Sequence, residues 1–369
     1  MTTSPKTRLD WVDTAKGISI FLVVLIHARR WLEFVGANAA WISEFNALFM
    51  TVRMPLFFAM SGLLAQRWVR DKSWRELFSG KLALLVWVFI VWQPIVFIYK
   101  YSSTWFIPNQ EDSSVQAHIL RAVISPLRPN GELWFLWALV IFFLIAKATR
   151  SIPVWLQLTL SGLVSAGWLS LAPVLFSESM LRQLGDGWNG LFSYYFFFLC
   201  ALLLRSEILR VTSASRWWNQ LIMVFVWIGV YVLVTRLAVD GIPGVQFLLR
   251  VAGFSAGISL ALLLHRITVL KTLGRQTLPI YLAHTFFVVG IVCILRVAGF
   301  DLSGPIASGI TPWSLAVVAM AISLALHKVA NRGVGTLLYA PPHAFAHVLS
   351  KTPNVPPPVR AQNKSHTRE

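Results

Sequence analysis

The chain alternates between long apolar runs and short polar segments. Most runs are about 17–25 residues long, the length that an α-helix needs to cross the hydrocarbon core of a membrane. The segments between them contain most of the Lys and Arg residues. This pattern predicts an all-α fold, a polytopic membrane helical bundle of about ten transmembrane helices. The predicted spans are 14–35, 46–65, 82–101, 133–148, 152–174, 190–205, 217–238, 243–265, 278–298 and 312–330.

Composition supports this assignment and removes one alternative. The chain is 56% hydrophobic and contains 17 Trp in 369 residues, more apolar surface than a soluble domain can bury. Its formal net charge of +17 would suit nucleic acid. The basic residues fall mostly between the apolar runs, however, as loop charges do in membrane proteins. We therefore expect a lipid bilayer as a partner and no nucleic acid.

The Lys and Arg residues also predict the orientation of the bundle. If the amino terminus lies in the cytoplasm, and a basic residue near a span end is counted with the adjoining segment, the inner segments contain 22 of the 32 Lys and Arg residues, the outer loops six and the spans four. Because cytoplasmic loops carry the excess of positive charge, both termini are expected in the cytoplasm. The predicted parts are a cytoplasmic segment (1–13), a transmembrane domain (14–335) and a Pro-rich cytoplasmic tail, expected to be disordered (336–369).

Smaller features complete the predicted organisation. The first apolar run has no small-residue cleavage site, which argues against a cleaved signal peptide. The longest outer loop, 102–132, has room for a short surface helix near 115–125. Cys200 and Cys293 lie singly in different apolar runs, and we expect buried packing residues rather than a disulfide or a metal pair.

The first span places ionisable residues at membrane depth. Lys16 and His27 are eleven residues apart, about three helical turns, and therefore lie on one helix face. Asp13 and Arg30 extend the same stripe. Because an imidazole exchanges protons near neutral pH, we interpret His27 as a catalytic residue. The structural alternative is a His27 that only hydrogen-bonds a neighbouring helix, with Arg29 and Arg30 extending toward the interface.

Three more residues are candidates for an acceptor site or cavity. Arg53 lies near mid-depth in the second span and suits an anionic or oxygen-rich ligand, or else a structural bridge between helices. Glu132 lies at the outer boundary of the fourth span and is a candidate acid or base. Trp134 suits the face of a sugar, or else an aromatic belt at the membrane interface.

The ninth span adds Tyr281 and His284, which are three residues apart and share a helix face. This span runs from inside to outside, so His284 is expected a turn or two above the cytoplasmic boundary, where it would contact a donor. Tyr281 is assigned to the acceptor site or cavity. A histidine satisfied by a neighbouring helix is the structural alternative.

Four stretches, in this order, resemble the membrane acyltransferase-3 family: "DTAKGISIFLVVLIHA", "MPLFFAMSGLLA", "LWFLWALVIFF" and "LGRQTLPIYLAH". Members are bacterial enzymes of about ten helices that acylate extracytoplasmic glycans and related acceptors. The resemblance implies that His27 is catalytic. The Arg that the family places ten residues before this His is Lys16 here, which keeps the charge but not the guanidinium. The family's Arg-rich motif corresponds to "WRELFSGKLALL", which has Arg75 and Lys81 but no close Arg pair.

The resemblance and these residues together predict an integral membrane O-acyltransferase of the bacterial inner membrane. An acetyl or succinyl group would pass from cytoplasmic acyl-CoA to a hydroxyl of an extracytoplasmic glycan or related acceptor. Acyl-CoA is expected as a co-substrate, with no permanently bound cofactor and no metal. The expected donor-binding residues are Lys16, Arg75, Lys81 and His284. The sequence carries no signal for an oligomeric state.

The sequence also fits two other functions. A row of mid-membrane cations, Arg29, Arg30, Arg53 and Arg250, would suit a transporter of a small anion or a glycan intermediate. A non-enzymatic sensor or scaffold fits the lack of a self-sufficient catalytic triad. ATP-driven transport and simple metallohydrolysis have no support, because the chain has no Walker-type loop, dinucleotide fingerprint, paired metal spacing or GxSxG motif.

Overall fold

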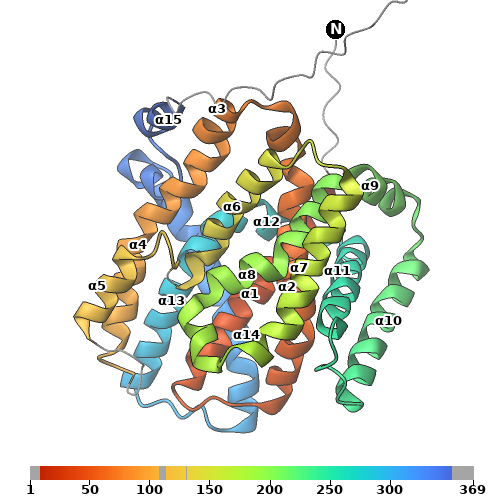
Figure 1. The fold of residues 1–369 in the computed structure, drawn as a ribbon. Helices are drawn as coiled ribbons and strands as arrows, with labels where there is room; N and C mark the ends of the chain where they lie inside the picture. The colour runs from red at the N-terminus through yellow and green to blue at the C-terminus, as the bar shows by residue number, and fades with distance from the viewer. Residues whose placement is uncertain (1–8, 108–113, 130, 351–369) are drawn as a thin grey trace, which may run out of the picture.

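A computed structural model describes residues 9–107, 114–129 and 131–350. Within these ranges every regular element is a helix or a helical turn, and there is no strand (Figure 1). The elements are α1 (Asp10–Glu33), α2 (Ala40–Gln66), a π-helical turn η1 (Arg67–Asp71), α3 (Trp74–Leu77), a π-helical turn η2 (Phe78–Leu82), α4 (Ala83–Ser103), α5 (Val115–Val123), a 3₁₀ turn η3 (Gly131–Leu133), α6 (Trp134–Ala148), α7 (Val154–Leu175), α8 (Glu178–Leu203), α9 (Arg205–Ala214), α10 (Trp217–Arg236), α11 (Val245–Leu263), α12 (Thr268–Arg275), α13 (Thr277–Val297), α14 (Pro305–Ala330), a 3₁₀ turn η4 (Gly333–Leu338) and α15 (His343–Ser350).

The predicted spans correspond to long apolar helices. In the described residues nine continuous helical segments are long and apolar enough to cross a membrane. The helices α8 and α9 meet the same criterion only when they are taken together as a tenth segment, and they bend by 74° at their junction. The predicted sixth span corresponds to α8, which begins earlier than expected and is broken at Gly185, where φ is 84°. The chain is therefore a polytopic helical membrane bundle.

Burial separates a central helix from peripheral ones. In the most apolar window of α1, 83% of the residues are buried, against 17% in α7 and in α10. Figure 1 shows α1 and α2 inside the bundle and α10 at its side. Because α7 and α10 are apolar around most of their circumference and yet exposed, their free faces suit lipid. The polar stripe of α1 therefore points into protein rather than into lipid.

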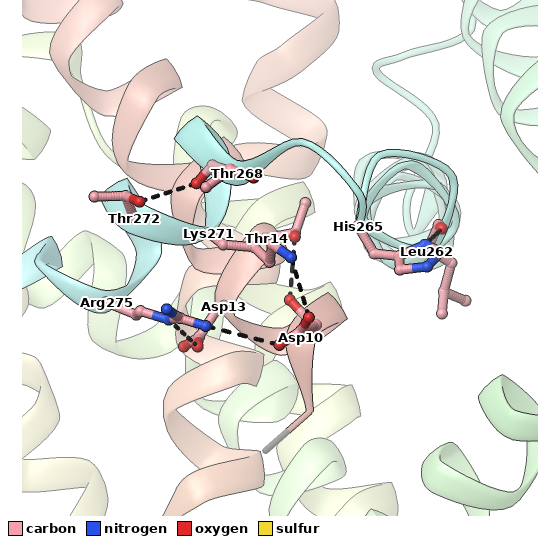
Figure 2. A network of polar contacts seen from close by, with 9 residues as sticks. All are labelled: Asp10, Asp13, Thr14, Leu262, His265, Thr268, Lys271, Thr272 and Arg275. Carbon is pink, nitrogen blue, oxygen red and sulfur yellow. Dashed lines mark hydrogen bonds and ion pairs between the residues drawn. The ribbon is translucent and has the colours of Figure 1, made fainter. Parts of the chain in front are cut away.

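The start of α1 is held against α12, near the other end of the sequence. A Cβ built on Gly274 would lie 1.7 Å from the carbonyl oxygen of Asp13, so only glycine permits this approach. Lys271 donates to Asp10 (3.1 Å) and Arg275 donates to Asp13 (3.2 Å), as Figure 2 shows. Glycine contact and ion pairs together fix the amphipathic helix α12 across the first turns of α1. We call this end of the bundle, with α3 and α15, the amino-terminal face.

Two peripheral predictions have different outcomes. The short helix expected near 115–125 is confirmed as α5, which packs along α4 at the side of the bundle, in the half away from the amino-terminal face (Figure 1). The sequence predicts a disordered tail from residue 336, whereas its described part is folded. The indole nitrogen of Trp92 donates to the carbonyl oxygen of Leu338 (2.8 Å), and Phe345 of α15 contacts Trp87. The rest of the predicted tail, 351–369, lies outside the described residues.

Candidate active site

The centre of the site is a pair formed by His27 of α1 and Glu132 of η3. Nδ1 of His27 lies 3.6 Å from Oε1 of Glu132, and the two side chains are 17% and 12% exposed. Tyr99 of α4 donates to the other carboxylate oxygen (2.6 Å), and Tyr281 of α13 donates to the backbone carbonyl of Glu132. Residues from four separate elements therefore fix one carboxylate beside one imidazole.

The turn before α6 explains how Glu132 reaches this position. Gly131 has a φ of +54°, which an L side chain rarely adopts, and the chain reverses there into the 3₁₀ turn. A Cβ on Gly131 would lie 2.6 Å from Nζ of Lys100, so glycine also leaves room for this lysine. The tight turn directs Glu132 into the bundle and places a cation beside it.

His284 lies directly behind His27, with 5.2 Å between the ring centroids. The His284 side chain is fully buried, and its Nδ1–H donates to the carbonyl oxygens of Ile280 (3.0 Å) and Tyr281 (2.8 Å). Its Nε2 lies 3.1 Å from Oγ1 of Thr285 and accepts from that hydroxyl. Because both ring nitrogens have partners, His284 packs as a neutral imidazole against the back of His27.

A cavity of about 480 Å³ opens in front of His27 and joins most of the predicted site residues. We call it the His27 cavity. Its lining includes His27, Arg30, Arg53, Glu132, Trp134 and Tyr281, which come from five different elements. The residues predicted for catalysis and for the acceptor or cavity therefore meet in one place. Arg29, in contrast, pairs with Glu33 and donates to Ser43 (2.9 Å), so the two neighbouring arginines have different surroundings.

A second cavity of about 280 Å³ lies nearer the amino-terminal face. We call it the Lys16 cavity, because Lys16 of α1 and Lys81 of η2 both line it. Two of the four residues expected to bind the donor are therefore together. Arg75 is exposed on α3 and does not line this cavity, and His284 lies against His27 instead of here. Asp13 pairs with Lys16 at 3.6 Å, as its spacing predicts.

A thin aromatic layer separates the two cavities. Phe57, Phe135 and Tyr281 line both of them. The rings of Phe57 and Phe135 are stacked, with 4.5 Å between centroids and 7° between planes, and Tyr281 packs on Phe135 at 5.4 Å. The distance from one cavity to the other is therefore about the thickness of one side chain. We call these three residues the aromatic partition.

Sequence reasoning missed several contributors to the site. Tyr99 and Phe57 lie within apolar runs, where an aromatic residue is indistinguishable from ordinary packing. Lys100 lies at the end of an apolar run, where a basic residue is typical of a span boundary. The position of Glu132 at the outer boundary of the fourth span predicts Glu132 itself, but it does not identify Tyr99 and Lys100 as its neighbours.

These features together indicate a class of protein. A multi-pass helical bundle presents a histidine–carboxylate pair at membrane depth, next to a second cavity lined by lysines. Such a pair can take a proton from a hydroxyl and return it to a leaving group. The arrangement suits a membrane protein that transfers a chemical group.

The chain belongs to the acyltransferase-3 family. The family model, described as an acyltransferase domain, matches residues 9–327 and so includes α1 to α14 almost entirely. The resemblance that the four sequence stretches indicate is confirmed. The protein is therefore a multi-pass membrane protein of this family, and the matched domain makes up most of the chain.

The chain is also similar to three curated proteins. It is 25% identical to a nodulation protein NolL of Mesorhizobium japonicum over 224 residues, 60% of this chain and 52% of that protein. It is 30% identical to the NolL of Sinorhizobium fredii over 139 residues, 37% of this chain and 35% of that protein. It is 23% identical to the inner membrane protein YcfT of Escherichia coli over 159 residues, 38% of this chain and 44% of that protein. The chain spans about half or less of these relatives, and no solved structure matches it.

Proposed function

We propose that this acyltransferase moves an acetyl or succinyl group from cytoplasmic acyl-CoA to a hydroxyl of an extracytoplasmic glycan or related small acceptor. Its proposed location is the bacterial inner membrane, where the similar YcfT is named as an inner membrane protein. One observation carries the proposal: the His27–Glu132 pair faces one cavity, and one aromatic layer away lies a cavity lined by lysines.

The two cavities lie at different depths, which suits two substrates from opposite sides. Lys16 and His27 are eleven residues apart on α1, about 16 Å along the helix axis. The Lys16 cavity is the one nearer the amino-terminal face, which the charge distribution predicts to be cytoplasmic. Acyl-CoA would approach through that cavity, and the acceptor would enter the His27 cavity from the other side.

Donor binding rests on charge and shape. Lys16 and Lys81 place two ammonium groups at the Lys16 cavity, where they would attract the phosphates of CoA. Arg75, exposed on the same face, adds positive charge at its periphery. The narrow arm of the donor would carry the thioester toward the aromatic partition. The adenine end would stay outside the bundle.

The proposed chemistry uses His27 as a base and then as an acid. Because Nδ1 of His27 faces Glu132, the free nitrogen that can take the acceptor's proton is Nε2. The hydroxyl oxygen attacks the thioester carbonyl, and the C–S bond breaks. His27 then returns the proton to the CoA sulfur, so the products are an ester and the free thiol. Glu132 stabilises the imidazolium that exists between these two steps.

The arginine positions give little support to a transporter. Of the four mid-membrane arginines, only Arg30 and Arg53 line the His27 cavity. Arg29 pairs with Glu33 instead. Arg250 donates to both the backbone and the side-chain oxygen of Gln246 on its own helix. These cations therefore do not follow one path through the described part of the bundle.

The central test replaces the base. His27→Ala should reduce acyl transfer by about 10²- to 10⁴-fold, the usual contribution of a general base. Transfer is measured by mass spectrometry of envelope glycans and by release of free CoA thiol from acetyl-CoA in membrane vesicles. His265→Ala is the matched control, because His265 contacts Leu262 near the amino-terminal face and lines neither cavity.

Wild-type transfer in correctly inserted His27→Ala would exclude His27 as the base.

A pair of variants at Lys16 tests the donor site. Lys16→Arg should retain more activity than Lys16→Ala and should bind acyl-CoA with a lower KM, because only the arginine keeps a positive charge for the phosphates.

A further inference from the structure

Arg53 is the one arginine in the His27 cavity that is buried. It lies in the middle of α2 with 8% of its surface exposed. Its Nη1 is buried and has no hydrogen-bond partner, and no carboxylate among the described residues forms an ion pair with Arg53. A buried cation without a partner is costly to fold. The cost is recovered when a ligand supplies the missing acceptor.

A second guanidinium lies on the same side of the cavity. Arg30 follows His27 by one helical turn on α1 and lines the cavity with Arg53. The nearby carboxylate of Glu132 already accepts from Tyr99 and faces His27. Of the three carboxylates that line the cavity, Glu33 pairs with Arg29, and Asp186 also lines the neighbouring hollow described next. The cavity therefore presents cationic donors beside the proposed base.

Positive charge continues from the cavity toward the α5 end of the bundle. A polar hollow of about 460 Å³, which we call the α5 vestibule, shares Lys100, Gly131, Asp186 and Asn189 with the His27 cavity. Its lining adds three arginines, namely Arg121, Arg128 and Arg182. The acid that it adds, Glu178, pairs with Arg182 at 3.5 Å. In the whole lining of the vestibule four basic side chains face two carboxylates, Glu178 and Asp186, so a ligand that enters this way meets an excess of positive charge.

We propose that the acceptor of this enzyme is anionic and that Arg53, with Arg30, binds its phosphate or carboxylate group close to the hydroxyl that is acylated. The proposal rests on the proposed function. A guanidinium binds such groups with two parallel hydrogen bonds, which orients the acceptor as well as holding it. A neutral sugar could accept a hydrogen bond from Nη1 of Arg53, but it would leave the buried positive charge without a counter-ion.

An anionic group for Arg53 could also come from the donor, as the distal carboxylate of a succinyl group. The geometry favours the acceptor, because the cations lie beyond the aromatic partition and continue away from the Lys16 cavity into the α5 vestibule. The experiment therefore has one arm for each source.

The first arm measures binding without turnover on the full-length protein in detergent. Glucose 1-phosphate and glucose are compared by the rise in thermal midpoint, which reports the ligand affinity. The phosphate ester should bind at least tenfold more tightly than glucose. Arg53→Gln should bring this ratio to about one, Arg53→Lys should restore part of it, and Arg29→Gln should leave it unchanged. Equal affinity for the two sugars, or no binding of either, would overturn the proposal.

The second arm measures transfer from acetyl-CoA and from succinyl-CoA to the two sugars. With acetyl-CoA, Arg53→Gln should raise the KM for glucose 1-phosphate about tenfold and change kcat much less. A loss confined to succinyl-CoA would assign the anion to the donor and overturn the proposal. An equal fall in kcat for both acceptors would make Arg53 a stabiliser of the reaction itself, which also overturns it. The proposed function is judged separately, by whether His27→Ala abolishes transfer.

Discussion

Glu132 receives hydrogen bonds at two of its oxygens from tyrosines on two different helices. Tyr99 donates to the carboxylate and Tyr281 to the backbone carbonyl, while the remaining carboxylate oxygen faces His27. A carboxylate held in this way cannot turn away from the imidazole. Its negative charge is therefore fixed where a positive charge would appear on His27 during the proposed proton transfer.

The charge of Glu132 can be removed while its shape is kept. Glu132→Gln keeps a side-chain oxygen for Tyr99 but no longer stabilises the imidazolium of His27. We expect kcat to fall by about 10²- to 10⁴-fold, with the KM for acyl-CoA within about twofold of wild type. Steady-state release of CoA thiol measures both. Glu207→Gln, at an exposed carboxylate on α9, is the control. A KM rise without a change in kcat would instead assign Glu132 to substrate binding.

At the scale of elements, α2 and α6 meet at the aromatic partition. Phe57 of α2 and Phe135 of α6 are stacked in parallel, and Tyr281 of α13 closes the third side. In the proposed reaction the thioester and the hydroxyl would meet at this layer. Before the acceptor binds, the layer would keep water of the His27 cavity away from the thioester.

Removal of one ring should connect the two cavities. In Phe135→Ala, water in the His27 cavity reaches the donor, so acetyl-CoA should be hydrolysed several-fold faster when no acceptor is present. Thiol release without acceptor measures this leak. Phe286→Ala is a matched control on α13, because Phe286 is 39% exposed and lines neither cavity. No increase in hydrolysis, with transfer intact, would show that the partition does not separate donor from water.

At the scale of the whole molecule, the proposed direction of transfer depends on orientation. The amino-terminal face is predicted to be cytoplasmic and α5 extracytoplasmic. Single cysteines at Thr268, exposed on α12, and at Gln116, exposed on α5, test this in a variant without Cys200 and Cys293. A membrane-impermeant maleimide should label Gln116→Cys in intact cells and Thr268→Cys only after lysis. The reverse pattern would place the Lys16 cavity on the side without acyl-CoA.

The sequence predicts the helices well because each span is long, apolar and bounded by charge. It also predicts that His27 faces protein, since the polar stripe of α1 repeats at helical spacing. Helical periodicity does not say which neighbouring helix a face meets. His284 was therefore placed at a donor site, whereas α13 turns it toward His27. The sequence likewise gives no signal for Tyr99, Phe57 and Phe135, because their positions in the site result from packing between helices that are distant in the chain.

The order in which the chain is made has a consequence for its insertion. Asp10 on the first helix pairs with Lys271 of α12, 261 residues later, and Asp13, which also pairs with Lys16 on its own helix, accepts from Arg275 of α12, 262 residues later. At about 5–20 residues per second, the ribosome needs roughly 13–50 s to supply those partners. Until α12 is made, the polar stripe of α1, a helix that is largely buried in the folded protein, has no contact with it. Early spans must therefore be sheltered, by the insertion machinery or by one another, until the last ones arrive.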